Sequence, residues 1–239
     1  MTARRDRKGA IPRTKRSIAA ALALVLLAPA ARAHHPGDRL DDAMGDKERY
    51  FQKIDRPAPA FDLVDADGNR ARLSDHADKV VVLHFVYASC PDVCPLHAEK
   101  IADVQRAIGI TPMKDAVRFV TVTTDPANDT PAVLKSYGAA HGLDAGNWTF
   151  LTTGPGQSED ATRKLAEAFG HKFAKADDGY QMHGVVTHVI DRNGRGAANF
   201  HGLRFATVNM VLYINGLVNR HQLPAPADGW WRRLKRLFD

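Results

Sequence analysis

Val80-Val-Val-Leu-His-Phe-Val86 runs directly into Tyr87-Ala-Ser-Cys90-Pro-Asp-Val-Cys94-Pro95, and this stretch decides the fold. The first seven residues form a nearly unbroken apolar run, which predicts a central β-strand covered on both faces. After Cys94, apolar residues recur at roughly helical spacing as far as Ile108. A helix that begins at the cysteines would place both sulfur atoms on one side of its first turn, because positions four apart are neighbours on a helix.

The sequence on either side predicts further strands and helices. Residues 61–69 alternate apolar and polar side chains and end in Asp67-Gly68, which indicates a strand and a hairpin turn. A β-branched strand is expected at 117–123, and strand, helix, strand implies a parallel crossover. We expect helices at about 131–141, 159–169 and 203–218, and a strand at 185–190 followed by an Asn193-Gly194 hairpin turn. This order indicates an α/β, thioredoxin-like fold: a central mixed sheet flanked by helices.

The N-terminal 33 residues have the pattern of a secretory signal. Seven Lys and Arg residues precede the uncharged run 18–28, which is shorter than the roughly 20 residues of a membrane span. Ala31-Arg32-Ala33 has small residues where a signal peptidase reads, so we expect cleavage after Ala33. The alternative is an uncleaved N-terminal anchor. Either way, we expect export to the periplasm or the outer face of the cytoplasmic membrane.

The basic charge of the chain belongs to this segment. Residues 1–33 hold eight of the 33 Lys and Arg residues and one of the 27 Asp and Glu residues, which leaves 25 basic against 26 acidic residues. The remaining chain is close to neutral, so its composition does not predict nucleic-acid binding.

Residues 34–56 are polar without apolar periodicity and predict a flexible leader, so we expect the folded domain to span 57–222. His34 and His35 would form the mature N-terminus, either as a weak Cu(II) site or as an incidental pair. In the tail, 223–239, the aromatic and basic residues 230–238 are typical of an interfacial membrane anchor, although a solvated tail explains them equally well.

The two cysteines, Cys90 and Cys94, indicate chemistry. A disulfide closing so short a loop would stabilise the fold little. Two thiolates supply soft donors for Cu(I) or Zn(II), and one imidazole would complete a three-coordinate copper site. The same thiols could instead form and break a disulfide by exchange with a partner.

Residues 85–95 resemble the SCO/SenC signature around its copper-binding cysteines. Asp125-Pro-Ala-Asn-Asp-Thr130 is similar to the family's DPxxDT segment. His183, five residues before His188-Val-Ile-Asp-Arg-Asn-Gly194, falls where the family has its ligand histidine. The resemblance spans about 57–220. It implies a thioredoxin-like fold, and one copper ion, as Cu(I) or Cu(II), held by Cys90, Cys94 and His183.

The resemblance also implies partners. It implies delivery of copper to the binuclear site of cytochrome c oxidase, in subunit II or a similar acceptor, with thiol-disulfide chemistry as part of that role or beside it. Another periplasmic copper chaperone or a thiol-disulfide reductase is a further expected partner. Three candidate functions remain: copper delivery, enzymatic reduction of the acceptor's cysteines, and a peroxiredoxin-like peroxidase. The residues before Cys90 disfavour the peroxidase.

Other residues near the motifs have supporting or structural roles in this interpretation. Asp92 could tune the thiols or cap the helix, and Asp125 is a candidate for support of the site or for partner contact. His84 is expected to be a satisfied core histidine, and His97 and His201 structural or exposed. His188 stands where the family often has an aromatic residue, and its alternation with Val186 and Ile190 indicates a packed or surface strand position.

Overall fold

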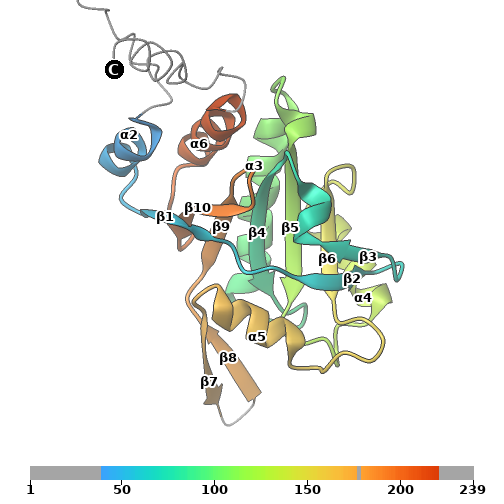
Figure 1. Cartoon of the computed structure of the whole chain (residues 1–239). Coiled ribbons are helices and arrows are strands. Elements are labelled where there is room, and N and C mark those ends of the chain that lie inside the picture. The colour runs from blue at the N-terminus through green and yellow to red at the C-terminus, as the bar shows by residue number, and fades with distance from the viewer. Residues whose placement is uncertain (1–38, 177–178, 221–239) are drawn as a thin grey trace, which may run out of the picture. The chain divides into compact units, whose positions relative to one another are not determined.

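The computed structural model describes residues 39–176 and 179–220, leaving aside the side chains of 174–183 and 220. Eight strands form one mixed sheet in the order β1-β10-β9-β4-β5-β6-β2-β3, and β7 and β8 form a separate hairpin (Figure 1). The strands are β1 (Phe51–Pro57), β2 (Asp62–Asp65), β3 (Arg70–Arg72), β4 (Val80–Val86), β5 (Val117–Thr123), β6 (Trp148–Thr152), β7 (Lys172–Ala176), β8 (Gly179–His183), β9 (Val186–Ile190) and β10 (Arg195–His201). The helices are α2 (Leu40–Lys47), α3 (Val93–Gly109), α4 (Pro131–Ala140), α5 (Ala161–Ala168) and α6 (Thr207–Arg220).

Strand β4 is the centre of the sheet. Every one of its residues is buried, as its apolar run predicts. It pairs in parallel with β5 along its whole length and antiparallel with β9. Helix α3 makes the crossover between β4 and β5, so the predicted strand, helix, strand unit is confirmed.

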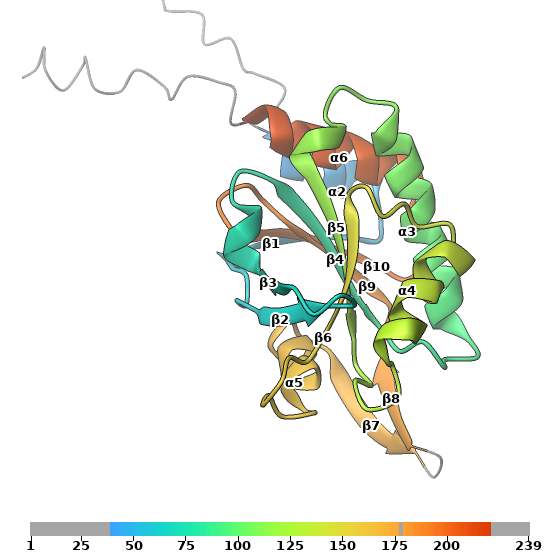
Figure 2. The same cartoon turned by 90° about the vertical axis from the view of Figure 1, so that its right-hand side faces the viewer.

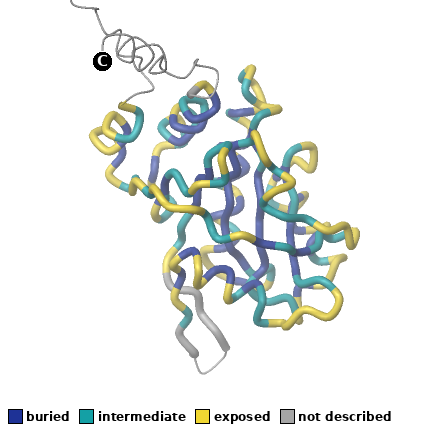
Figure 3. Tube along the Cα trace, viewed as in Figure 1, coloured by how far each residue is buried: buried dark blue, intermediate teal, exposed yellow. Residues whose placement is uncertain are grey.

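Helices cover both faces of the sheet and enclose two apolar cores. One core packs β4 against α3, α4 and α6 and includes both cysteines. The other packs the alternate β4 residues, Val81, Leu83 and Phe85, against α5 and β2. Figure 2 shows α3 and α5 on opposite sides of the strands, and Figure 3 shows the buried centre between them. The expected α/β architecture, a mixed sheet flanked by helices, is therefore confirmed.

Two turns form where the sequence predicts hairpins. Gly68 connects β2 and β3 with φ of 80°, and Gly194 connects β9 and β10 with φ of 74°. In each turn the glycine N–H donates to the carbonyl oxygen three residues earlier. Positive φ favours glycine at both positions. Strand β6 and the β7–β8 hairpin were not predicted.

The predicted flexible leader is wrong for residues 40–56, most of which lie in α2 and β1. Strand β1 is added to the sheet edge by pairing with β10. Met44 is buried in the first core although it is the only large apolar side chain inside α2 after Leu40. The folded domain therefore begins before Pro57, and its order here depends on pairing with β10, far along the chain.

Several predictions concern residues outside the described ranges. The signal segment, its cleavage site, His34 and His35, and the tail 223–239 are among them. No helix within 39–176 or 179–220 is both long and apolar enough to cross a membrane.

Glu48 provides a test of the corrected domain boundary. Its carboxylate is buried and accepts hydrogen bonds from the Ala206 N–H and the Asn209 side-chain amide, both at 2.9 Å. We expect Glu48→Ala to lower the free energy of unfolding by about 2–3 kcal/mol, because it leaves these donors without their acceptor. Urea denaturation measures the change, and Asp46→Ala, at an exposed carboxylate of α2, is the matched control. Equal stability of the two variants would mean that this segment does not support the fold.

Candidate metal centre

Strand β4 and helix α3 position the two cysteines. The chain leaves β4 at Val86 and turns tightly, with the Cys90 N–H donating to the Tyr87 carbonyl oxygen at 3.2 Å. Cys90 lies just before α3, and Cys94 lies in its first turn. The predicted junction is thus confirmed, and both sulfur atoms are near the positive end of the helix dipole.

Both cysteines are free thiols and are almost fully buried, with 7% of Cys90 and 5% of Cys94 exposed. Burial opposes ionisation of Cys90. Hydrogen bonds from the Cys94 thiol and from the backbone N–H groups of Asp92 and Cys94 outweigh burial and hold the pKa of Cys90 below its ordinary value. Burial, together with donation of its S–H to Cys90, raises the pKa of Cys94. Cys90 is therefore the thiol that ionises first, and Cys94 supports its thiolate.

Asp92 contributes through its backbone. It occupies the residue before α3, where a capping side chain is expected, but its carboxylate makes no capping hydrogen bond. The capping interpretation is therefore wrong for this residue. Its backbone N–H instead stabilises the Cys90 thiolate, and its side chain lines the cleft described below.

Asp129 connects the cysteine loop to β5, a role that the sequence analysis missed. Its carboxylate is 2% exposed, and its two oxygens accept the Ala88 N–H at 3.2 and 3.1 Å. It also accepts the Thr123 hydroxyl. The sequence signal was present in the DPxxDT segment, but only the fold shows that this carboxylate reaches across to the loop before Cys90.

Asp125 lies in the same loop with a different role. Its N–H donates to the Thr123 hydroxyl oxygen at 2.9 Å, and its carboxylate accepts the Asn128 amide at 3.0 and 2.9 Å. Its side chain does not bond to the cysteine loop among the hydrogen bonds of the described residues, yet it lines the same cleft as the thiols. Its position therefore suits contact with a bound partner.

The thiols face a cleft of about 570 Å³. Its lining comes from the cysteine loop, the first turn of α3, the loop after β5 and the segment after β8. Asp92 and Asp125 contribute carboxylates, and Arg163 from α5 contributes a cation. The cleft gives a second macromolecule or its ligand a route to the sulfur atoms.

His183 is the last residue of β8, whereas the sequence predicted a loop position. Its backbone pairs with Lys172 of β7. The side chain of His183 lies outside the described part of the structure, but Gly184 and Val185, which follow it, line the cleft. Among the described side chains, no three from His, Cys, Asp and Glu are gathered in a way that could hold a metal ion. The role of His183 as a ligand stays a prediction.

Two further histidines are buried beneath the thiol pair. His97, 2% exposed, lines the cleft, and its Nε2 lies 2.8 Å from the Thr187 hydroxyl. Its ring packs against His84, with centroids 4.7 Å apart. His84 is a core residue as predicted, with Nε2 at 3.3 Å from the Thr121 hydroxyl, but its Nδ1 has no partner among the described residues. Burial lowers the pKa of His84 to about 3 and holds the pKa of His97 well below its ordinary value, so both rings stay uncharged near neutral pH.

These features define a class: a thioredoxin-like domain with a reduced CxxxC thiol pair where its central strand meets a helix. A family model described as SCO1/SenC matches residues 52–211. The chain therefore belongs to the SCO1/SenC family.

Individual relatives agree with this placement. A SCO2-like protein of Rickettsia prowazekii (strain Madrid E) is 32% identical over 162 residues, which cover 64% of this chain and 72% of the relative. The solved structure of BsSco, described as a member of the Sco family of cytochrome c oxidase assembly proteins with a disulfide switch, has a TM-score of 0.61 at 20% identity and covers 70% of this chain and 96% of BsSco. Bradyrhizobium japonicum ScoI, solved with copper bound, has a TM-score of 0.55 at 24% identity and covers 67% of this chain and 99% of ScoI. These two structures show that the fold is shared.

The hydrogen bond between the two thiols leads to a prediction about the reactivity of Cys90. Cys94→Ala removes the S–H donor, so we expect the pKa of Cys90 to rise. Cys94→Ser keeps a hydroxyl donor, and the rise should be smaller. The pH dependence of Cys90 alkylation by iodoacetamide, followed by mass spectrometry, gives the pKa of Cys90 in wild type and in the two variants. The same pKa in all three proteins would exclude Cys94 as the group that stabilises the thiolate.

The buried carboxyl of Asp129 leads to a prediction about how folding stability depends on pH. Burial raises the pKa of this carboxyl above its unfolded value, against the opposing hydrogen bonds from Thr123 and Ala88. The folded state then holds a proton that the unfolded state releases, so its contribution to stability is lost as pH rises through the folded pKa. Asp129→Asn removes this titration. We expect the stability of wild type relative to Asp129→Asn to fall as pH rises above the ordinary carboxyl pKa of about 4, as measured by urea unfolding. A relative stability that increases with pH would show a lowered pKa instead.

Proposed function

We propose that this protein binds one copper ion through the thiolates of Cys90 and Cys94 and the imidazole of His183, and delivers it to the binuclear copper site of cytochrome c oxidase. The observation that carries the proposal is the reduced thiol pair in an open cleft lined also by Gly184 and Val185, next to His183 in sequence. Membership of the SCO1/SenC family supports copper as the cargo, as do a related structure with copper bound and another from a cytochrome c oxidase assembly family.

The donor set suits Cu(I). Thiolates are soft ligands, and an imidazole nitrogen completes a three-coordinate site. Both thiols must lose their protons to bind metal, so binding is coupled to proton release. Cys90 is prepared for this by its lowered pKa, and Cys94 gives up its proton when copper arrives. Three ligands leave an open coordination position, which an acceptor's ligand can enter to take the ion by exchange.

The cleft also suits contact with an acceptor. Asp92 and Asp125 line it and supply carboxylates beside the thiols. The acceptor we propose is cytochrome c oxidase subunit II or a similar copper protein, and the donor is another periplasmic copper chaperone. This requires the domain to lie outside the cytoplasm, in agreement with the signal-like residues 1–33 and the basic aromatic residues 230–238 as a membrane contact.

The unequal thiols favour one second candidate, a thiol-disulfide reductase that keeps the acceptor's cysteines reduced. The Cys90 thiolate would attack an acceptor disulfide, forming a mixed disulfide and releasing one acceptor thiolate. Cys94 would then lose its proton, attack Cys90 and release the second acceptor thiolate. The acceptor gains two electrons, and the Cys90–Cys94 disulfide that forms must be reduced by a separate thiol-disulfide reductase. This reaction gives His183 no direct role.

Anaerobic Cu(I) titration against a chromophoric chelator separates the candidates. Copper delivery predicts one tightly held equivalent in the reduced wild type, with affinity at least about tenfold lower in Cys90→Ser, Cys94→Ser and His183→Ala. His141→Ala, at the residue that follows the end of α4, is the control and should bind as wild type does. If His183→Ala also binds as wild type does while disulfide exchange is intact, the proposed ligand set is wrong and the reductase function is favoured.

A further inference from the structure

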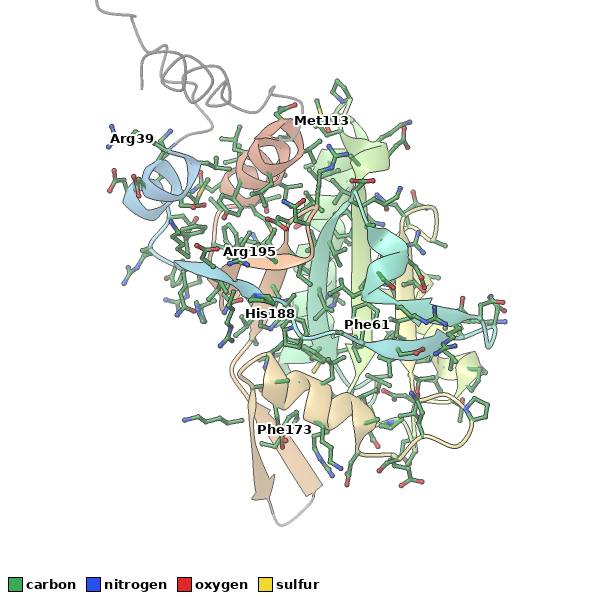
Figure 4. The ribbon with its side chains drawn as sticks, viewed as in Figure 1. Arg39, Phe61, Met113, Phe173, His188 and Arg195 are labelled. Carbon is green, nitrogen blue, oxygen red and sulfur yellow. The ribbon has the colours of Figure 1, made fainter. Side chains whose placement is uncertain are left out.

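A second group of histidines lies near the exposed edge of the sheet that carries β1, away from the thiol cleft. His188 is on β9, His201 is on β10, and His171 is in the turn between α5 and β7. Strand pairing sets His188 opposite Asn199, and His201 follows two residues later on the same face of β10. Figure 4 labels His188 beside α5. All three histidines line one hollow of about 490 Å³.

His171 and His188 form a close pair. Their Nε2 atoms are 2.9 Å apart, and their ring centroids are 5.1 Å apart. His188 is packed against the rings of Phe85 and Phe169, which lie in the second core. The thiols belong to the first core, on the opposite face of the sheet. His188 is therefore a packed strand residue, as one reading of the sequence held, and it does not line the thiol cleft.

Asn199 fixes the orientation of the His188 ring. The Nδ1 atom of His188 lies 2.7 Å from Asn199 Oδ1, an acceptor, so Nδ1 carries the proton and donates it. The Asn199 amide donates in turn to Gln52 Oε1 at 3.3 Å, which supports this assignment. The Nε2 atom of His188 then presents a lone pair toward His171. A ring held by a hydrogen bond through its other nitrogen is the arrangement that metal-binding histidines adopt.

We propose that His171, His188 and His201 bind a divalent metal ion of borderline softness, with Cu(II) the preferred ion, at a site separate from the thiol pair. Imidazole nitrogen suits Cu(II) and Zn(II), and Cu(II) binds more tightly at a given nitrogen site. The site needs neither cysteine, so this proposal does not depend on the proposed copper delivery.

The observed distances fit this ion. Cu(II) prefers a square-planar or tetragonal arrangement, in which metal–nitrogen bonds of about 2.0–2.1 Å at a right angle hold two neighbouring imidazole nitrogens roughly 2.8–3.0 Å apart. The His171 and His188 nitrogens already lie 2.9 Å apart. The Nδ1 atom of His171 is buried without a partner among the described residues, so the hydrogen-bonded pair leaves part of this ring unsatisfied.

His201 supplies the third ligand by moving. It is exposed, and its Nε2 lies 2.9 Å from Gln52 Oε1. No three metal-ligating side chains of the described residues already form a site, so two imidazoles are preformed and His201 must leave Gln52 to join them. A surface hydrogen bond of this kind contributes little net free energy, so its loss does not prevent His201 from reaching the ion.

Protonation and charge do not prevent binding. Burial lowers the pKa of His188 to about 3 and that of His171 to about 4, so both rings are neutral at physiological pH and keep a lone pair. Lys53 and Arg56 also line the hollow and oppose a cation there. Lys53 is paired with Asp41 at 3.3 Å, which reduces its effect.

The test uses the full chain carrying Cys90→Ser and Cys94→Ser, with His34→Ala and His35→Ala to remove the other candidate Cu(II) ligands. Titration with Cu(II), followed by electron paramagnetic resonance and visible absorption, should show one bound ion with nitrogen hyperfine coupling in the resonance spectrum and no sulfur charge-transfer band in the absorption spectrum. We expect His201→Ala to weaken binding about tenfold or more, and His171→Gln combined with His188→Phe to abolish it. His141→Ala in the same background should change nothing.

Folding is checked by circular dichroism, and His201→Ala keeps the test decisive because its side chain is exposed. An unchanged Cu(II) affinity and spectrum in His201→Ala would overturn the three-histidine site. If the protein that carries only the four background substitutions does not bind Cu(II), the three-histidine site is also overturned. That result would not contradict the proposed copper site at the thiols.

Discussion

The pairing of β4 between β5 and β9 is the constraint on which the rest of the structure depends. A strand buried on both faces and hydrogen-bonded on both edges has no freedom to shift, because a slip of one residue would exchange its two sets of side chains between the cores. Its last residue, Val86, therefore fixes where the chain enters the cysteine loop. Asp129 then holds the loop from the neighbouring strand end through the Ala88 N–H. The position of the sulfur atoms follows from these two attachments.

The same burial that fixes the cysteines would make them inert if nothing opposed it. Loss of solvent disfavours a thiolate, and Cys94 shows this effect directly in its raised pKa. At Cys90, hydrogen bonds from the Cys94 thiol, the backbone N–H groups of Asp92 and Cys94 and the Tyr87 side chain reverse it. One sulfur is thus prepared to react and the other to assist. This division serves metal binding and disulfide exchange alike. Only the proposed metal binding uses the imidazole of His183, so a substitution of His183 distinguishes the two proposals.

The sequence predicted the parts of the fold that depend on local pattern. The apolar run at 80–86, the thiol pair and the two glycine turns were all found where expected, since each has its cause within a few residues. Residues 40–57 were not, because α2 buries only Met44 deeply and β1 gains its order from pairing with β10. Asp129 could not be chosen from its neighbours either, since its bond to Ala88 spans 41 positions. Likewise, the contact of His171 with His188 arises only when a turn folds over a strand.

X-ray absorption spectroscopy of the full chain loaded with one equivalent of Cu(I) tests the central claim most directly. The account predicts copper bound by two sulfur atoms and one imidazole nitrogen, with the nitrogen contribution lost in His183→Ala and retained in His141→Ala. A copper shell without sulfur, or one that is the same in wild type and His183→Ala, would contradict it.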